Sequence, residues 1–527
     1  AHFSPPWLVI WVLSIEAGPV ENCVAAYNAI KAYDKSRPVQ YERNNDIVDM
    51  GSNQYPSVSW VQYVVKGKAG VKYPFHISEY AHSMGNSLGN LVDYWEAIES
   101  TNFFMGGAIW DWVDQALYGI DGGKRYMGYG GDFAPVNKPN DGMFCMNGIM
   151  CPDLAPKAQY YEVKKVYQNV GVKAVDLTQG LIEIFNKNYF APLTDYVITW
   201  SLWKDGECVL ADRYLQGPRN IVGPRERQRY RLDYDFNALD PQSEYFVKVQ
   251  FKLANDMPWA DKGFVQMEEQ LLVRTATQAA PAMAQVAKAD ERIGVKDEAA
   301  GITLSGKGFS ARFDKATGSL SALSYGGRTI IAEGHGPKLD AYRAPTDNDA
   351  GIGYPNAWFQ YGLYNLQHKA LSHALVTKKD GSVQLSFTVE SQAPKGSRQT
   401  YGNGDRTPES TYRFDVDQRD LTPDDLKFTT NQVYTIYPDG SIELQSAISA
   451  NRQNIVLPRI GYALELPAEF SRYDYYGRGP VNNYNDRKTG QFIEHHASTV
   501  AEQGIMLPKP QAQGNREEVR WCALTNQ

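Results

Sequence analysis

Two glutamates occupy positions from which a pair of carboxylates could cleave a glycosidic bond. Glu16 follows the apolar run at residues 8–13, and Glu79 follows a second run at residues 74–78. One carboxylic acid of such a pair donates a proton to the leaving oxygen, while the other carboxylate attacks the anomeric carbon. A separation of ~5–5.5 Å would retain the configuration at that carbon. A single Glu at a strand end is more often solvated or salt-bridged, so the prediction depends on the surrounding elements.

Residues 1–162 alternate short apolar runs with helical patterns, which is typical of a parallel sheet. The apolar runs lie at residues 8–13, 38–41, 47–55, 74–78 and 104–110. Amphipathic helices are predicted at residues 20–35 and 88–100. Polar side chains follow the carboxyl ends of the runs, namely Glu16, Glu42, Tyr55, Glu79, Asp111 and Asp114. A (β/α)8 TIM barrel holds its catalytic residues at these ends. We therefore predict the second half of such a barrel, with five of its strands.

The rest of the chain is predicted to be β structure in two domains. Strand patterns and an Asp205-Gly206 hairpin signal predict an Ig-like β-sandwich over residues 163–275. Residues 276–295 are Ala-rich and predict a linker. Strand patterns resume over residues 296–527, with turn signals at Gly318 and Gly440, and predict a large β-sandwich. Its last strand pattern, at residues 519–527, is expected to stop without closing a sheet.

Composition excludes several partner classes. The 527 residues are enough for about three to four domains. A net charge of -7 with 21% charged residues leaves no basic face for nucleic acid or an anionic membrane. The longest apolar run, residues 7–13, is far short of the ~20 residues that span a bilayer. Five scattered cysteines without CxxC pairing argue against a disulfide framework and a zinc site. The compartment stays open between cytoplasm and periplasm.

Several motifs resemble those of one enzyme family. They are YDKSRPVQYE (33–42), SEYAHSMGNSLGNLVDYW (78–95), GGAIWDWVDQ (106–115), YGGDF (129–133), FCMNG (144–148), RAPTDNDAGIG (343–353) and YYGRGPVNNYNDRKTG (475–490). In this order they resemble the glycoside hydrolase family 2 β-galactosidases of the large multidomain type. The resemblance implies hydrolysis of terminal non-reducing β-D-galactosyl residues, as in lactose or oligosaccharides, with double displacement through a covalent glycosyl-enzyme.

The resemblance also implies a role for individual residues. Glu79 corresponds to the nucleophile and Glu16 to the general acid/base. Tyr55 corresponds to the tyrosine that hydrogen-bonds the nucleophile, and His82 to a histidine that touches a sugar hydroxyl. Trp110 corresponds to the tryptophan on which the galactose ring stacks, because an indole plane suits the C–H face of that sugar. Without the motifs, Tyr55 would be interpreted as a packing residue, His82 as a structural histidine, and Trp110 equally well as a barrel-lining core residue. Asp111, Trp112 and Asp114 are predicted either to support the site residues or to pack.

Two metal ions are implied by the same resemblance. The backbone carbonyl of Phe144 and the side chain of Asn147 correspond to ligands of a sodium ion, and Asn147 also to a substrate contact. Glu16 corresponds to a magnesium ligand. Oxygen ligands of this kind suit hard cations. No organic cofactor is implied, and a homo-oligomer is expected.

The sequence departs from the family pattern at Ile15. The family has an Asn before the acid/base, and this Asn donates a hydrogen bond to the sugar 2-hydroxyl that strengthens in the transition state. Ile cannot donate that bond. One alternative is therefore a catalytically impaired carbohydrate-binding homologue that keeps Trp110 and His82. A second is a related β-glucuronidase or β-mannosidase, although these lack the RAPTDND type of last domain.

The resemblance implies N-terminal domains and a first half of the barrel that this sequence does not contain, and a last domain cut before its end. A barrel without three of its eight strands has two unpaired edges and an uncovered core. We therefore expect the chain to be part of a larger enzyme and to be inactive by itself.

Overall fold

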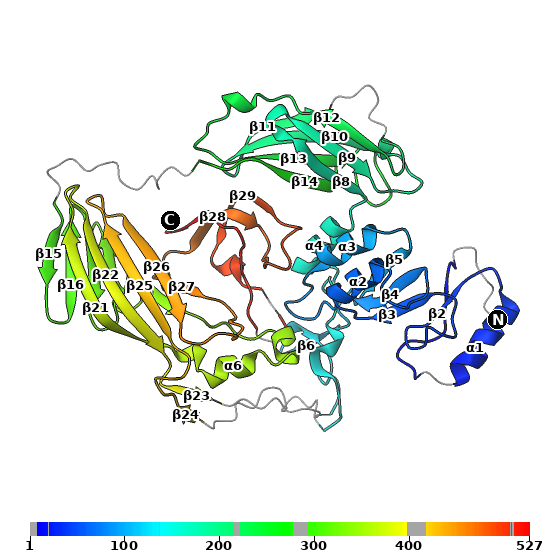
Figure 1. Cartoon of the computed structure of the whole chain (residues 1–527), viewed down its shortest axis with the longest axis horizontal. Helices are drawn as coiled ribbons and strands as arrows, with labels where there is room; N and C mark the ends of the chain where they lie inside the picture. Colours follow the sequence, from blue (N-terminus) through cyan, green and yellow to red (C-terminus); the bar gives the residue numbers. More distant parts are fainter. Residues whose placement is uncertain are drawn as a thin grey trace.

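The computed structural model describes residues 8–18, 21–135, 137–215, 222–277, 292–397, 418–505, 507–508 and 511–526. Its first region alternates parallel strands with helices (Figure 1). These elements are β1 (Trp11–Val12), α1 (Glu21–Tyr33), β2 (Val39–Gln40), β3 (Gly51–Gln54), α2 (Val58–Val65), β4 (Phe75–Tyr80), α3 (Leu91–Glu99), β5 (Phe104–Ile109) and α4 (Ala158–Val166). Each of the five predicted apolar runs overlaps one of these strands, and both predicted helices form.

Two parallel sheets make up this region. Strand β1 pairs with β2, and β3, β4 and β5 form a three-stranded sheet in that order. The amide of Gln40 at the end of β2 donates to the Ser52 hydroxyl in β3 over 2.9 Å, which joins the two sheets. Buried Phe75, Ile77 and Leu91 pack the strands against α2 and α3. Parallel order brings the carboxyl ends of β1 and β2 together in one sheet and those of β3, β4 and β5 together in the other. A barrel holds its chemistry at such strand ends.

A hairpin that the sequence did not predict follows β5. It consists of β6 (Leu117–Asp121) and β7 (Lys124–Gly128), which pair antiparallel. Gly122 and Gly123 both have positive φ in its turn, as two-residue hairpins require. Within the described residues, no helix combines the length and the apolar character that a membrane crossing requires.

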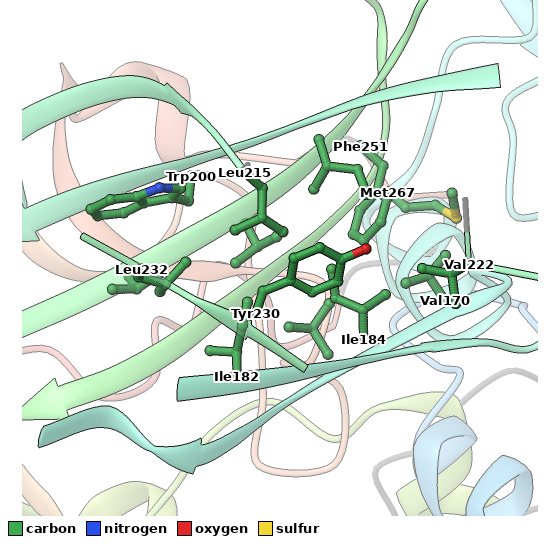
Figure 2. Packing of buried hydrophobic residues seen from close by; sticks show 14 of the residues in the cluster. Val170, Ile182, Ile184, Trp200, Leu215, Val222, Tyr230, Leu232, Phe251 and Met267 are labelled. Atoms are coloured by element: carbon green, nitrogen blue, oxygen red, sulfur yellow. The ribbon is translucent and has the colours of Figure 1, made fainter. Parts of the chain in front are cut away.

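The second region is a sandwich of two antiparallel sheets. One sheet has the order β12-β9-β8 and the other β11-β10-β13-β14. Their strands are β8 (Val170–Asp176), β9 (Leu181–Asn186), β10 (Tyr196–Lys204), β11 (Glu207–Tyr214), β12 (Arg227–Arg231), β13 (Tyr245–Leu253) and β14 (Val265–Arg274). Side chains of both sheets, among them Ile184, Tyr230 and Phe251, face each other in the core (Figure 2). Three strands against four is typical of the Ig class.

The predicted turn between β10 and β11 forms at Asp205 and Gly206, whose φ angles are 50° and 90°. Positive φ at both central positions is the geometry that Asp-Gly favours in a hairpin. Most of the predicted linker lies outside the described residues, because residues 278–291 are not described.

The third region contains the predicted large β-sandwich. Its sheets have the orders β15-β16-β17-β18-β19 and β21-β22-β25-β26. The first sheet contains β15 (Gly294–Asp297), β16 (Gly301–Gly306), β17 (Phe309–Asp314), β18 (Leu320–Tyr325) and β19 (Arg328–Ile331). The second contains β21 (Gln367–Thr377), β22 (Val383–Gln392), β25 (Phe428–Ile436) and β26 (Ile442–Ala450). Gly318 and Gly440 adopt positive φ in the predicted turns, and Phe313 contacts Tyr434 across the core.

Smaller elements border this sandwich. They are the paired strands β20 (Lys338–Asp340) and β27 (Gly461–Ala463), the paired strands β23 (Lys395–Ser397) and β24 (Gln418–Asp420), and the helices α5 (Asp347–Gly351) and α6 (Pro355–Gln360). Trp358 of α6 is buried and donates its indole N–H to the carbonyl of Val456 over 2.7 Å.

A last three-stranded sheet lies at the centre of the molecule (Figure 1). It has the order β29-β28-β30, with β28 (Arg472–Gly479), β29 (Phe492–Thr499) and β30 (Trp521–Thr525). Residues 519–527, expected to stop without closing a sheet, contain β30, which pairs with β28 from Trp521 to Thr525 and lies at the edge of this sheet. The sheet contacts the Ig-like sandwich: Ile493 and Tyr476 pack on Phe246, and the amide of Gln270 exchanges hydrogen bonds with the Ile493 backbone.

We expect Ile184→Ala to destabilise the Ig-like sandwich by about 2–5 kcal/mol, because the residue is fully buried between two sheets and leaves a cavity. Hydrogen exchange of the β9 and β13 amides in the whole chain measures this loss. The matched control is Val209→Ala on β11, where the side chain is 53% exposed. Equal exchange rates in the two variants would contradict the assigned core.

Candidate active site

The ends of β3 and β4 bring Tyr55 and Glu79 together. Glu79 is paired in register with Gln54, the last residue of β3. The backbone N–H of Tyr55, the next residue, donates to the Glu79 carbonyl over 2.8 Å. The Glu79 carboxylate also raises the pKa of the Tyr55 hydroxyl, and Glu79 is only 8% exposed. The buried carboxylate therefore has a phenol as a direct neighbour.

Glu16 is connected to the same strand end through Gln54. The Gln54 side-chain amide donates to Glu16 Oε1 over 2.8 Å, and the Glu16 backbone N–H donates to Glu42 Oε1 over 2.8 Å. The guanidinium of Arg43 lies 3.7 Å from Glu16. The Glu16 side chain is 60% exposed, in contrast to the buried Glu79. The residue that reaches Glu16 is thus the register partner of Glu79, so both carboxylates belong to one edge of the parallel strands.

The pKa of the Tyr55 hydroxyl depends on its burial and on the charges around it. Partial burial raises the pKa of Tyr55 well above its ordinary value, and the hydrogen bond and charge of Glu79 raise it further. The charges of Glu16 and Asp111 raise the same pKa. Tyr55 therefore stays protonated and can donate a hydrogen bond to Glu79. Three carboxylates from different strand ends act on this one hydroxyl.

His82 lies beside Tyr55 and Phe144. Its ring centroid is 6.0 Å from that of Tyr55, edge-on, and 5.5 Å from that of Phe144. Burial lowers the pKa of the His82 imidazole. A neutral imidazole has one N–H donor and one acceptor nitrogen, which suits contact with a hydroxyl group.

Trp110 directly follows β5 and is half-buried. Its backbone N–H donates to the Tyr80 carbonyl over 3.1 Å, and its carbonyl accepts from the Ser83 N–H over 2.9 Å. These bonds hold Trp110 against the residues that follow Glu79. The next residue, Asp111, donates its N–H to the Asn147 carbonyl over 2.8 Å. Three strand ends and the segment around residue 147 thus converge.

Asn147 and Phe144 provide oxygen atoms at neighbouring positions. Asn147 is buried, and its Nδ2 donates to the Phe144 carbonyl over 2.6 Å. Its Oδ1 is buried and has no hydrogen-bond partner among the described residues. The oxygen and nitrogen of an Asn amide are assigned from hydrogen bonding, and a flipped amide would place Oδ1 beside the carbonyl. A hard cation suits such a pair of oxygens.

The described residues contain no group of three or more His, Cys, Asp or Glu side chains that could hold a metal ion. Glu16 is a carboxylate that also accepts from Gln54 and lies near Arg43. Of the predicted magnesium ligands, the described part of the chain therefore contains only the Glu16 carboxylate.

Some residues near the site differ from their predicted roles or were missed. Asp114 is buried and pairs with Lys157 over 2.9 Å, as a packing residue would. Trp112, predicted either to support the site residues or to pack, is 58% exposed, which does not fit packing. No sequence motif pointed to Gln54, which is hydrogen-bonded to Glu16, or to Arg43, whose guanidinium lies 3.7 Å from Glu16. Gln54 stands at the end of an apolar run, directly before Tyr55, and that position was the available signal.

Family models match three regions that together cover most of the chain. Residues 4–172 match the model described as "Glycosyl hydrolases family 2, TIM barrel domain". Residues 182–274 match "Beta-galactosidase, domain 4", and residues 305–527 match "Beta galactosidase small chain". The chain belongs to glycoside hydrolase family 2. The three matched regions follow one another in the order in which the structure forms a parallel sheet region, an Ig-like sandwich and a large β region.

Curated relatives are similar to almost the whole chain. The β-galactosidase of Priestia megaterium is 32% identical over 99% of this chain and 46% of its own length. Those of Halalkalibacterium halodurans and Lactobacillus delbrueckii subsp. bulgaricus are each 29% identical over 98% of this chain, and over 47% and 46% of their own lengths. The chain spans about half the length of the curated relatives it matches.

We expect the His82 imidazole to stay neutral at pH 6.5, the ordinary pKa of histidine, because burial lowers its pKa. The unfolded chain binds this proton and the folded chain does not, so folding stability falls as the pH drops from 6.5 towards the folded pKa. Nitrogen chemical shifts of labelled histidine, assigned with His82→Gln, measure the titration. A His82 signal that is half protonated at pH 6.5 or above would contradict the prediction.

Proposed function

We propose that this chain carries the catalytic residues of a retaining β-galactosidase. The observation that carries the proposal is the link from Glu16 through Gln54 to the strand end of Glu79. Family 2 membership and relatives named β-galactosidase support the choice of galactoside as substrate. The proposal concerns the complete protein, expressed from its full reading frame.

In the first step, the Glu79 carboxylate attacks the anomeric carbon and forms a glycosyl ester. Glu16 donates its proton to the departing glycosidic oxygen, so the aglycone leaves as a neutral alcohol. The exposure of Glu16 suits a group that must meet a leaving group and exchange protons with water, and the burial of Glu79 suits a nucleophile shielded from water.

In the second step, Glu16 removes a proton from a water molecule, which attacks the same carbon and releases the Glu79 carboxylate. Two inversions restore the original configuration. The Tyr55 hydroxyl donates to the Glu79 carboxylate and stabilises the charge that returns to it. Because Tyr55 keeps its proton, this donation is available in both steps.

Recognition of the sugar is assigned to Trp110 and His82. An indole next to the strand ends can stack on the C–H face of galactose, while the neutral imidazole of His82 contacts a hydroxyl group. Asn147 is proposed as a further substrate contact, because it is hydrogen-bonded to Phe144, whose ring lies beside His82.

Two cations are proposed in addition. Sodium would be held by the Phe144 carbonyl and by Asn147 Oδ1, the buried oxygen without a partner in the described part of the chain. When bound, it would provide a positive charge for a substrate hydroxyl. Glu16 is proposed as one magnesium ligand, with further ligands required from outside the described residues. A homo-oligomer also remains a proposal.

Glu79→Gln in the complete protein should lower kcat for a chromogenic β-galactoside by at least about three orders of magnitude, because the amide cannot form the glycosyl ester. The matched control is Glu96→Gln, an exposed glutamate on α3, which should keep the wild-type rate. Activity that survives Glu79→Gln would remove Glu79 as the nucleophile.

Ile15→Asn should raise kcat/KM by about two orders of magnitude, because Asn restores a donor to the sugar 2-hydroxyl that strengthens in the transition state. Ile15 is 58% exposed, so the substitution leaves no cavity. Ile15→Leu, which restores no donor, serves as the control in the same assay. An unchanged kcat/KM would mean that this contact does not limit the rate.

A further inference from the structure

The loop at residues 81–90 joins β4 to α3 and carries His82, so its position determines part of the site. Within the parallel sheet region, the loop is held by the Ser83 N–H, which donates to Trp110, and by Gln159, whose amide donates to the Gly85 carbonyl over 2.8 Å. The remainder of the loop, from Gly85 onwards, faces the last β region.

The last β region contacts this loop at several points. Asn86 donates two hydrogen bonds there: its N–H donates to Gln511 Oε1 over 3.1 Å, and its Nδ2 donates to the Ala512 carbonyl over 2.8 Å. The Asn90 N–H donates to the Asp486 carbonyl over 2.7 Å. The approach is close, since a Cβ added at Gly89 would lie 2.1 Å from the Asp486 side chain.

Arg487 makes the most buried of these contacts. It is 4% exposed, and its Nη1 donates to the Ser87 carbonyl over 2.6 Å while its Nη2 donates to Asn86 Oδ1 over 2.8 Å. Its Nη2 has one further acceptor, Asn482 Oδ1, at 3.5 Å, and its Nε has no hydrogen-bond partner among the described residues. The charges of Asp486 and Glu162 also act on Arg487. A desolvated guanidinium depends on its hydrogen-bond acceptors, and the loop supplies the two nearest ones.

The segment that carries Arg487 is itself fixed to the parallel sheet region. Tyr484 and Arg487 exchange backbone hydrogen bonds of 3.0 and 2.9 Å, which closes a tight turn. Three residues later, the Gly490 N–H donates to Glu162 Oε2 on α4 over 2.8 Å. A Cβ at Gly490 would lie 2.4 Å from the Tyr161 carbonyl. The turn is therefore anchored on one side while Arg487 holds the loop on the other.

We propose that Arg487 is a positioning residue for the catalytic centre: through Ser87 and Asn86 it fixes the loop that carries His82. Substrate binding and turnover at Glu79 then depend on a contact from the last β region. The catalytic part of this inference rests on the proposed function, whereas the fixing of the loop does not.

Kinetics of three variants of the complete protein test the catalytic part. Arg487→Met should lower kcat/KM for a chromogenic β-galactoside by about 10²-fold and raise KM about tenfold, since a displaced loop weakens both binding and alignment. Arg487→Lys should recover about tenfold in kcat/KM, because an ammonium can still reach one acceptor.

The matched control is Arg520→Met. Arg520 belongs to the same β region and donates two hydrogen bonds, of 2.9 and 2.8 Å, to Glu244 of the Ig-like sandwich rather than to the loop. It should keep the wild-type KM. A variant that is merely less folded loses kcat with KM unchanged. That outcome for Arg487→Met, or an equal rise of KM in Arg520→Met, would overturn the proposal.

Hydrogen exchange tests the fixing of the loop without any substrate. Amides at residues 83–90 should exchange about tenfold or more faster in Arg487→Met than in the wild type or Arg520→Met. Unchanged exchange in Arg487→Met would overturn the proposal even if the protein hydrolyses galactosides. A wild-type protein that hydrolyses none, together with faster loop exchange in Arg487→Met, would instead refute the proposed function while supporting the loop contact.

Discussion

The rest of the site depends on the hydrogen bond from the Gln54 side chain to Glu16. The position of Gln54 at the end of β3 is fixed by pairing with Glu79, and its amide donates to Glu16. One residue thus relates two carboxylates that are 63 positions apart in the chain. Tyr55, the next residue, responds to both charges through its pKa. If this relation were absent, the two glutamates would be unrelated strand-end residues.

Local patterns predicted most of the strands, but not the β6–β7 hairpin or the side chains that connect the strand ends. Hydrophobic periodicity and turn residues are local features of the sequence. The apolar runs therefore predicted the five parallel strands, and Asp205-Gly206 predicted its hairpin. The role of Gln54 arises from strand register, which a single strand pattern does not contain. The sequence left open whether Trp112 packs or supports the site residues, and its exposure argues against packing. The pairing of β30 was missed because its partner β28 lies at residues 472–479.

The two β regions differ in what they give to the site. The Ig-like sandwich has its own core between two sheets, and it meets the last sheet through Phe246 and Glu244. The last β region also reaches the loop after Glu79, 400 residues away in sequence at Ser87 and Arg487. Because of this contact, the position of the loop at residues 81–90 depends on the folding of the last β region. The contact also accounts for a buried guanidinium that would otherwise be costly to retain.

The central claim is that Glu79 and Glu16 act on a single glycosidic bond, and covalent trapping tests it most directly. A 2-deoxy-2-fluoro-β-galactoside with a dinitrophenolate leaving group should esterify Glu79, which mass spectrometry of the peptide around residues 75–86 would locate. The same ester should form in Glu16→Gln, because the dinitrophenolate leaving group needs no proton. An analogue with an alkoxide leaving group does need a proton, so it should form no ester in Glu16→Gln. An ester on another residue, or equal trapping of both analogues in Glu16→Gln, would contradict the account.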